Sequence, residues 1–167
     1  MVSCKARPNP GDPMRLRHAL PLLLAGTLLA ACASNPAVRH YPPQASLQQL
    51  QRLPDGSWQA QVRLQNFSTG PVAFHELSLK VRILDGEWTE LGGAELPKIG
   101  ANAAEVVNVS APFGPATRAE LDARLGKSQP VRYRLEGSIR SIDPGRRYEL
   151  QYDGRLNPAP GLDGVYR

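Results

Sequence analysis

The stretch Leu77-Ser78-Leu79-Lys80-Val81-Arg82-Ile83-Leu84-Asp85-Gly86 decides the fold of this 167-residue chain. Its apolar residues alternate with Ser, Lys and Arg, which is the period of a β-strand with one buried and one wet face. The dipeptide Asp85-Gly86 then predicts a two-residue hairpin turn of type I′. We therefore expect one strand to end here and a second strand to return from Trp88.

Period-2 alternation recurs on both sides of this stretch. It predicts strands over residues 58–65, 105–111, 131–140 and 148–152. Asp143-Pro144-Gly145 predicts a type II turn in the last hairpin. Between residues 45 and 53 the apolar residues fall at a spacing of three, and we expect a bulged edge strand there.

One short helix is predicted over residues 115–125. Pro115 suits its first turn, Leu121 and Leu125 form an i, i+4 apolar pair, and Gly126 suits the C′ position. About seven strands with regular turns and this helix indicate an all-β, antiparallel, immunoglobulin-like β-sandwich. We expect its core to contain the apolar residues Trp58, Val62, Leu64, Leu79, Val81, Val109, Tyr133, Leu135 and Leu150.

The pattern of residues 45–157 resembles the group 2 late embryogenesis abundant domain, also called the water-stress and hypersensitive-response domain. The resemblance rests on a strand ending in Asn66, the 77–86 stretch, Gly92 or Gly93 ahead of Leu96-Pro97, a Val-rich strand over 106–109, and the closing 131–137 strand. The family often has Asn-Pro-Asn at the first landmark, whereas Asn66 is followed here by Phe67-Ser68. The resemblance implies a protective or adhesive, non-enzymatic module.

Residues 1–31 have the order of a secretory signal peptide, with Met14 as a possible true start. Basic residues precede an apolar run over residues 20–31, which is twelve residues long and shorter than the roughly 20 needed to span a bilayer. The string Leu29-Ala30-Ala31-Cys32 resembles a bacterial lipobox, which implies diacylglycerol and N-acyl lipid on Cys32. Since Ala33 rather than Asp follows, we expect the inner leaflet of the outer membrane, with the domain facing the periplasm.

The chain is thus expected to divide into four parts. A signal peptide over 1–31 precedes a lipidated tether over 32–44, which is rich in Pro and polar residues. The sandwich follows over 45–157, and residues 158–167 are expected to form a flexible tail.

Removal of the signal peptide changes the charge and cysteine inventory. Residues 1–31 carry four of the 20 Lys and Arg and one of the 15 Asp and Glu, so the formal net charge falls from +5 to +2. This weakens any expectation of a nucleic-acid partner. Cys32 is then the one remaining cysteine, and the mature chain has no Met and only His40 and His75. We expect no disulfide, no metal and no cofactor other than the lipid on Cys32.

No enzyme is predicted. Catalysis needs a nucleophile with a base, two carboxylates or a metal cluster. His75 and Glu76 are neighbours, but adjacent residues of a strand point to opposite faces.

One basic surface is predicted on the last hairpin. We call it the arginine face, and it comprises Arg132, Arg134, Arg140, Arg146 and Arg147. It has two interpretations: a solvated face that protects a sheet edge, or a contact for anionic lipid. The resulting hypothesis is a membrane-anchored, protective module whose partners are client proteins or anionic lipid. The alternative is a pilotin-like or envelope-assembly subunit that docks a partner by strand addition.

Overall fold

The computed structural model describes residues 37–93 and 95–167, so the predicted signal peptide and Cys32 lie outside the described residues. Residues 38–167 form one unit. Its elements are β1 Gln44–Arg52, β2 Trp58–Gln65, β3 Val72–Ile83, β4 Trp88–Leu91, β5 Lys98–Ile99, β6 Ala104–Ser110, α2 Pro115–Gly126, β7 Val131–Ser141, β8 Arg147–Leu156 and β9 Val165–Tyr166.

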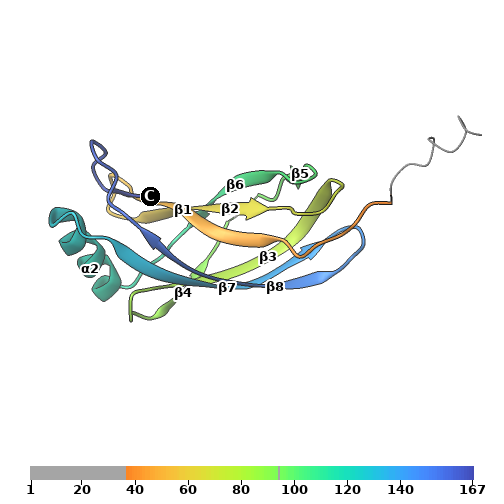
Figure 1. The fold of residues 1–167 in the computed structure, drawn as a ribbon. Coiled ribbons are helices and arrows are strands. Elements are labelled where there is room, and N and C mark those ends of the chain that lie inside the picture. Colours follow the sequence, from red (N-terminus) through yellow and green to blue (C-terminus); the bar gives the residue numbers. More distant parts are fainter. Residues whose placement is uncertain (1–36, 94) are drawn as a thin grey trace, which may run out of the picture. The chain divides into compact units, whose positions relative to one another are not determined.

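The strands form two antiparallel sheets that pack face to face (Figure 1). One sheet has the order β6-β2-β1-β9, and the other has the order β4-β3-β7-β8, with β5 on the first residues of β3. Seven of the described strands have four or more residues. Among the described residues α2 is the one helix, and the predicted all-β sandwich with one short helix is therefore confirmed.

The core lies between the two sheets, where alternation places the apolar residues of each strand. All nine residues expected in the core are buried, from Val62 at 0% exposed to Leu150 at 5%. At one end, Trp58 stacks on Tyr166 with ring centroids 6.3 Å apart and meets Phe113 edge-on at 6.5 Å. Such pairs contribute stability beyond the area that they bury.

Strand β1 contains the predicted bulge, but it lies between β2 and β9 and is therefore not the edge strand that was predicted. Its pairing with β2 shifts between Leu47 and Gln49. There the Tyr133 hydroxyl, on β7 in the other sheet, accepts from Leu47 N–H at 3.1 Å and donates to Leu47 C=O at 3.3 Å. The phenol therefore satisfies both backbone groups that β1 directs away from β2 at this residue.

The tail was wrongly predicted to be flexible. Val165 and Tyr166 form β9 beside β1, Arg52 N donates to Gly164 O at 2.8 Å, and Tyr166 is fully buried. The Tyr166 hydroxyl also donates to Leu121 O at 2.9 Å and so links the tail to α2. The glycines of this segment, Gly161 and Gly164 with φ of 77° and 73°, form turns that bring the chain back to the sheet.

Two local turn predictions were also wrong. The residue with positive φ in the β3–β4 connection is Leu84 at 52°, and the last ladder pair is Arg82 with Trp88, so the connection is longer than a two-residue turn. Leu84 N donates to Arg132 O at 2.8 Å, a tertiary bond that holds this conformation. At the end of α2, Gly126 is still helical and the positive φ of 52° falls on Ser128.

Candidate functional site

The arginine face lies on the outer side of the β3-β7-β8 sheet and is largely paired. Arg134 forms a bidentate ion pair with Asp153 at 2.6 and 3.0 Å. The hydrogen bond from Arg134 lowers the pKa of Asp153, and the same bond raises the pKa of Arg134. Arg140 lies 3.2 Å from Glu76, and Arg147 lies 3.4 Å from Glu149.

These pairs change the character of the predicted surface. Three of its five arginines are paired with acids: Arg134 and Arg140 with acids on adjacent strands, and Arg147 with Glu149 on its own strand. Lys80 and Glu136 add a further pair at 3.3 Å. Such exposed pairs contribute little stability individually, but they cancel the local positive field. Arg132 and Arg146 have no ion pair among the described residues. Arg146 lies in the β7–β8 turn, at an end of the sandwich rather than on the sheet.

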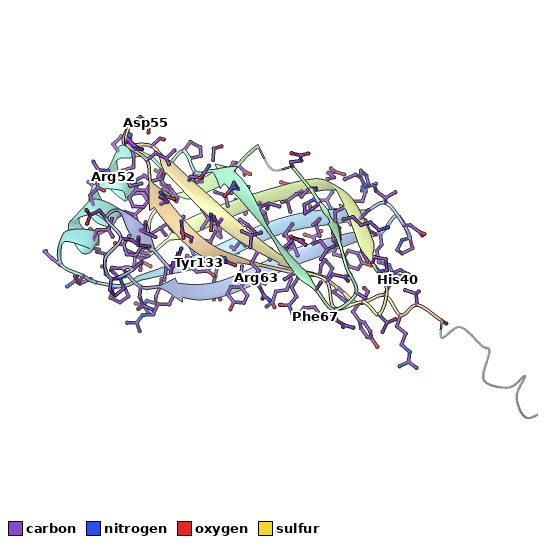
Figure 2. The ribbon with its side chains drawn as sticks, turned by 90° about the horizontal axis from the view of Figure 1, so that it is seen from above. His40, Arg52, Asp55, Arg63, Phe67 and Tyr133 are labelled. Atoms are coloured by element: carbon purple, nitrogen blue, oxygen red, sulfur yellow. The ribbon has the colours of Figure 1, made fainter. Side chains whose placement is uncertain are left out.

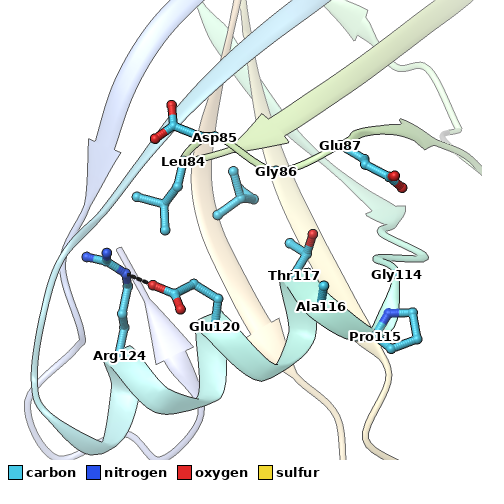
Figure 3. Close-up of a pocket in the computed structure, with 11 residues that line it drawn as sticks. Leu84, Asp85, Gly86, Glu87, Gly114, Pro115, Ala116, Thr117, Glu120 and Arg124 are labelled. Atoms are coloured by element: carbon cyan, nitrogen blue, oxygen red, sulfur yellow. Dashed lines mark hydrogen bonds and ion pairs between the residues drawn. The ribbon is translucent and has the colours of Figure 1, made fainter.

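A hollow of about 440 Å³ lies between the β3–β4 connection and α2 (Figure 3). Leu84, Pro115 and Ala116 give it apolar walls, while Glu120 accepts from Arg124 Nε at 2.6 Å. Asp85 and Glu87 add carboxylates from the connection. Because Arg124 is already engaged, none of the described residues that line the hollow offers a free cation for an anionic substrate.

The only neighbouring His and acid in the described chain do not form a catalytic pair. His75 lies at a bulge of β3, between the ladder positions Phe74 and Glu76, and is exposed. Glu76 is engaged by Arg140. Among the described residues, no group of three or more His, Cys, Asp and Glu side chains is placed to hold a metal ion.

The Asn66 side chain organises the loop between β2 and β3. It is buried, donates to Gly70 O at 3.0 Å and Gly100 O at 2.9 Å, and accepts from Ser68 N at 2.8 Å. One amide thus fixes residues 66–71 against the β5–β6 loop. The sequence pattern marks Asn66 as the end of a strand but does not indicate this role, because the acceptors of its amide lie up to 34 residues away.

The same loop holds the segment that leads into the sandwich. Arg39 N donates to Thr69 Oγ1 at 2.8 Å, Thr69 N donates to Arg39 O at 3.0 Å, and Tyr41 N donates to Ser68 Oγ at 3.0 Å. Val38 packs on Gly70, where an added Cβ would lie 2.7 Å from Val38 Cγ1. The part of the predicted tether from residue 38 onward is therefore bound to the domain.

We call this part of the molecule the entry end. It comprises residues 38–42, 66–71, 100–103 and 142–146, and Figure 2 shows His40 and Phe67 there, with Arg52 and Asp55 at the opposite end. Four of the six exposed large hydrophobic side chains of the described residues lie here: Val38, Tyr41, Phe67 and Ile142, at 52%, 44%, 39% and 60% exposed. In the sequence, each of these four is an aromatic or β-branched residue inside a stretch that is otherwise typical of a loop, and that contrast could have indicated an exposed apolar side chain.

Strand β6 is a free sheet edge. Ser110 exchanges two backbone hydrogen bonds with Gly92, at 2.8 and 3.2 Å, on the side away from β2. Because backbone direction alternates along an antiparallel strand, Val106 and Asn108 direct their N–H and C=O groups to that same side. No strand of the described residues pairs with them there.

No helix within the described residues has the length and apolar character needed to cross a membrane. No protein-family model matches the chain, and no curated protein matches it.

Several solved structures are similar in fold. A protein assigned to the late embryogenesis abundant class is 14% identical, with 90% of this chain and 88% of that chain covered and a TM-score of 0.45. A Bordetella pertussis protein assigned as ApaA is 15% identical, with 75% and 100% covered and a TM-score of 0.42. A protein from Arabidopsis thaliana is 13% identical, with 80% and 93% covered and a TM-score of 0.42.

Proposed function

We propose that this chain is a non-enzymatic, lipid-anchored binding module of the cell envelope. Cys32 carries the diacylglycerol and the N-acyl chain, and the sandwich faces the periplasm from the inner leaflet of the outer membrane. The observation that supports this best is the order of the chain. Cys32, the last residue of the Leu29-Ala30-Ala31-Cys32 string, lies six positions ahead of Val38. Val38 packs on Gly70 of the β2–β3 loop and so belongs to the folded domain.

The role that fits this domain is protective binding of many clients. Its charged side chains lie outside and are paired across strands, and the described residues offer no group that could hold a metal ion. We expect such a solvated surface of paired charges to make weak contacts with many partners. The resemblance noted in the sequence implies the same kind of role under water stress.

A desiccation assay tests the protective role. The mature protein, mixed with a labile reporter enzyme and taken through drying and rehydration, is expected to preserve more reporter activity than an unrelated β-sandwich of equal mass. Capture of the membrane-anchored form from cells is expected to yield many proteins at low ratio. Equal protection by the unrelated sandwich would contradict the proposal.

The free edge of β6 supports a second candidate, an assembly subunit that accepts a strand from one partner. Outward backbone groups at Val106 and Asn108 are the donors and acceptors that strand addition uses. Val106→Pro removes one outward N–H and leaves the β2 ladder intact, since Pro is tolerated on such edges. If strand addition operates, a single partner co-purifies at a fixed ratio with the natural chain and is lost with Val106→Pro. If the Val106→Pro variant retains that partner, the β6 edge is not the docking site.

A further inference from the structure

We propose that the entry end lies against the anionic lipid surface and inserts Phe67, Tyr41 and Ile142 into its interface. This inference rests on the proposed lipid anchor and adds to it which surface of the domain meets the membrane. It replaces the arginine face as the candidate lipid contact.

The reach of the chain restricts which surface can approach the bilayer. Val38 lies six positions after Cys32, and an extended chain covers at most about 3.3–3.6 Å per residue, or roughly 20 Å in all. Because residues 38–41 are hydrogen-bonded to the β2–β3 loop, they add no slack. An acyl chain on Cys32 therefore keeps the entry end within about 20 Å of the lipid.

The loop geometry holds Phe67 outward. Its two neighbours, Asn66 and Ser68, are each 1% exposed and hydrogen-bonded, so the side chain between them faces solvent without backbone freedom. An exposed aromatic on a fixed loop loses little conformational entropy when it is buried. Aromatic residues are also the side chains that favour the interface between water and lipid.

The charges around this apolar group suit an anionic surface. Arg39 and Arg146 are exposed and have no ion pair among the described residues, whereas Asp143 is the one acid of the entry end. Lys98, exposed on β5 where it pairs with Ala73 of β3, adds a further cation nearby. Basic residues beside exposed apolar side chains are typical of surfaces that lie in a membrane interface.

Two or more acyl chains give stable membrane attachment, so the lipid proposed on Cys32 does not need the entry end for attachment. The entry end adds a second contact by apolar insertion and charge. It also fixes the orientation of the sandwich, so that α2 and the Arg52–Asp122 ion pair at the opposite end point into the periplasm (Figures 1 and 2).

The test measures which end of the domain touches lipid. A fluorescent amino acid is placed at Ala101, in the loop that bonds to Ser68, or at Lys127, beyond α2; both positions are exposed. Vesicles of phosphatidylcholine with 30% phosphatidylglycerol, as a chosen probe, carry spin-labelled lipid as quencher. We expect quenching at position 101 and none at position 127, and equal quenching at both positions would overturn the proposal.

Matched variants separate insertion from mere proximity. Phe67→Ser with Ile142→Ser is expected to abolish quenching at position 101. Val106→Ser with Leu162→Ser removes the two exposed large hydrophobic side chains of the described residues that lie outside the entry end. This variant is expected to leave the quenching at position 101 unchanged. Arg39→Gln and Arg146→Gln are each expected to lower the equilibrium constant for contact between the entry end and the lipid about fivefold at low salt. Unchanged quenching in the Phe67/Ile142 variant would overturn the proposal.

Two preparations distinguish failure of this inference from failure of the anchor. One is the protein purified from membranes, and the other is residues 32–167, which contain the complete unit 38–167, coupled through the Cys32 thiol to a maleimide lipid. The second is anchored whether or not the cell lipidates Cys32. If only the first preparation fails to float with vesicles, the anchor proposal fails. If the coupled preparation floats without quenching at position 101, the orientation proposal fails.

Discussion

Tyr133→Phe removes one hydroxyl from the centre of the sandwich and should destabilise it far more than its small change in volume suggests. The hydroxyl joins β7 to β1 through the N–H and C=O of Leu47, at 3.1 and 3.3 Å. Leu47 is 5% exposed, and Tyr133 is equally buried. The ring also packs directly on Gly154, where an added Cβ would overlap it.

The magnitude follows from the two backbone groups left without a partner. An unsatisfied buried donor or acceptor costs about 1–3 kcal/mol, and we expect a total loss of about 2–4 kcal/mol because the groups belong to one residue. Tyr152→Phe is the matched control. Tyr152 stacks on Tyr133 with centroids 6.1 Å apart but is only half-buried, and we expect a loss within about 0.5 kcal/mol.

Urea unfolding followed by tryptophan fluorescence measures the loss of unfolding free energy in both variants. We expect the dependence of that free energy on urea concentration to be unchanged. A pH series adds a second readout, because burial raises the pKa of Tyr133 and of Tyr166 from 10.0 to about 12. A raised folded-state pKa contributes stability that is present below pH 10 and is lost as pH rises towards 12. Tyr133→Phe should lessen that alkaline loss. Equal stability of the two phenylalanine variants would refute this account of the inter-sheet bond.

Three further perturbations test other parts of the fold. Leu79→Ala should cost about 2–5 kcal/mol, whereas Lys80→Ala, one residue out of phase, should cost about 0.5 kcal/mol; equal losses in thermal unfolding would contradict the strand register. Asn66→Ala should cost about 2–3 kcal/mol and raise hydrogen exchange across residues 66–71, and unchanged exchange would contradict the role of this amide. Tyr166→Ala should cost about 3–5 kcal/mol by opening the contact with Trp58 and α2, and a loss below about 1 kcal/mol would mean that the tail is dispensable.

The strands and the core were predictable because they depend on local alternation. β2 begins at Trp58 and ends at Gln65, as predicted. β3 extends the predicted strand back to Val72, but the bulge at His75 shifts the alternation, so that Val72 and Phe74 are the buried residues before it. Period-2 patterning gives each strand its buried face without reference to the partner strand. The all-β class follows from the number of such segments.

The remaining features depend on partners far away in the sequence. Tyr133 and Leu47 are 86 residues apart, and Tyr166 and Leu121 are 45 apart. Residues 158–167 have the composition of a flexible tail, because Pro, Gly and Asp are common both in flexible tails and in ordered turns. The segment is ordered here because Tyr166 is buried between the sheet and α2. The pairing of Arg134 with Asp153 likewise depends on the β7–β8 register.

The candidate site was predicted only in part. Asn66 and the 66–71 loop were recognised as a break in the strand pattern, but the exposure of Phe67 follows from the burial of its two neighbours. Ile142 joins the entry end because its N–H donates to Ala73 O at 2.8 Å. Such juxtapositions of loops arise from the sandwich topology and leave no signal in any one segment.

The most direct test of the central proposal is acylation of Cys32 in living cells. Cells that express the natural chain or Cys32→Ser are fed an alkyne analogue of palmitate, and the captured protein is analysed by mass spectrometry. We predict an acylated chain that begins at residue 32 for the natural protein and no label for Cys32→Ser. Equal labelling of the two proteins, or a natural chain that retains residues 1–31 without lipid, would contradict the account.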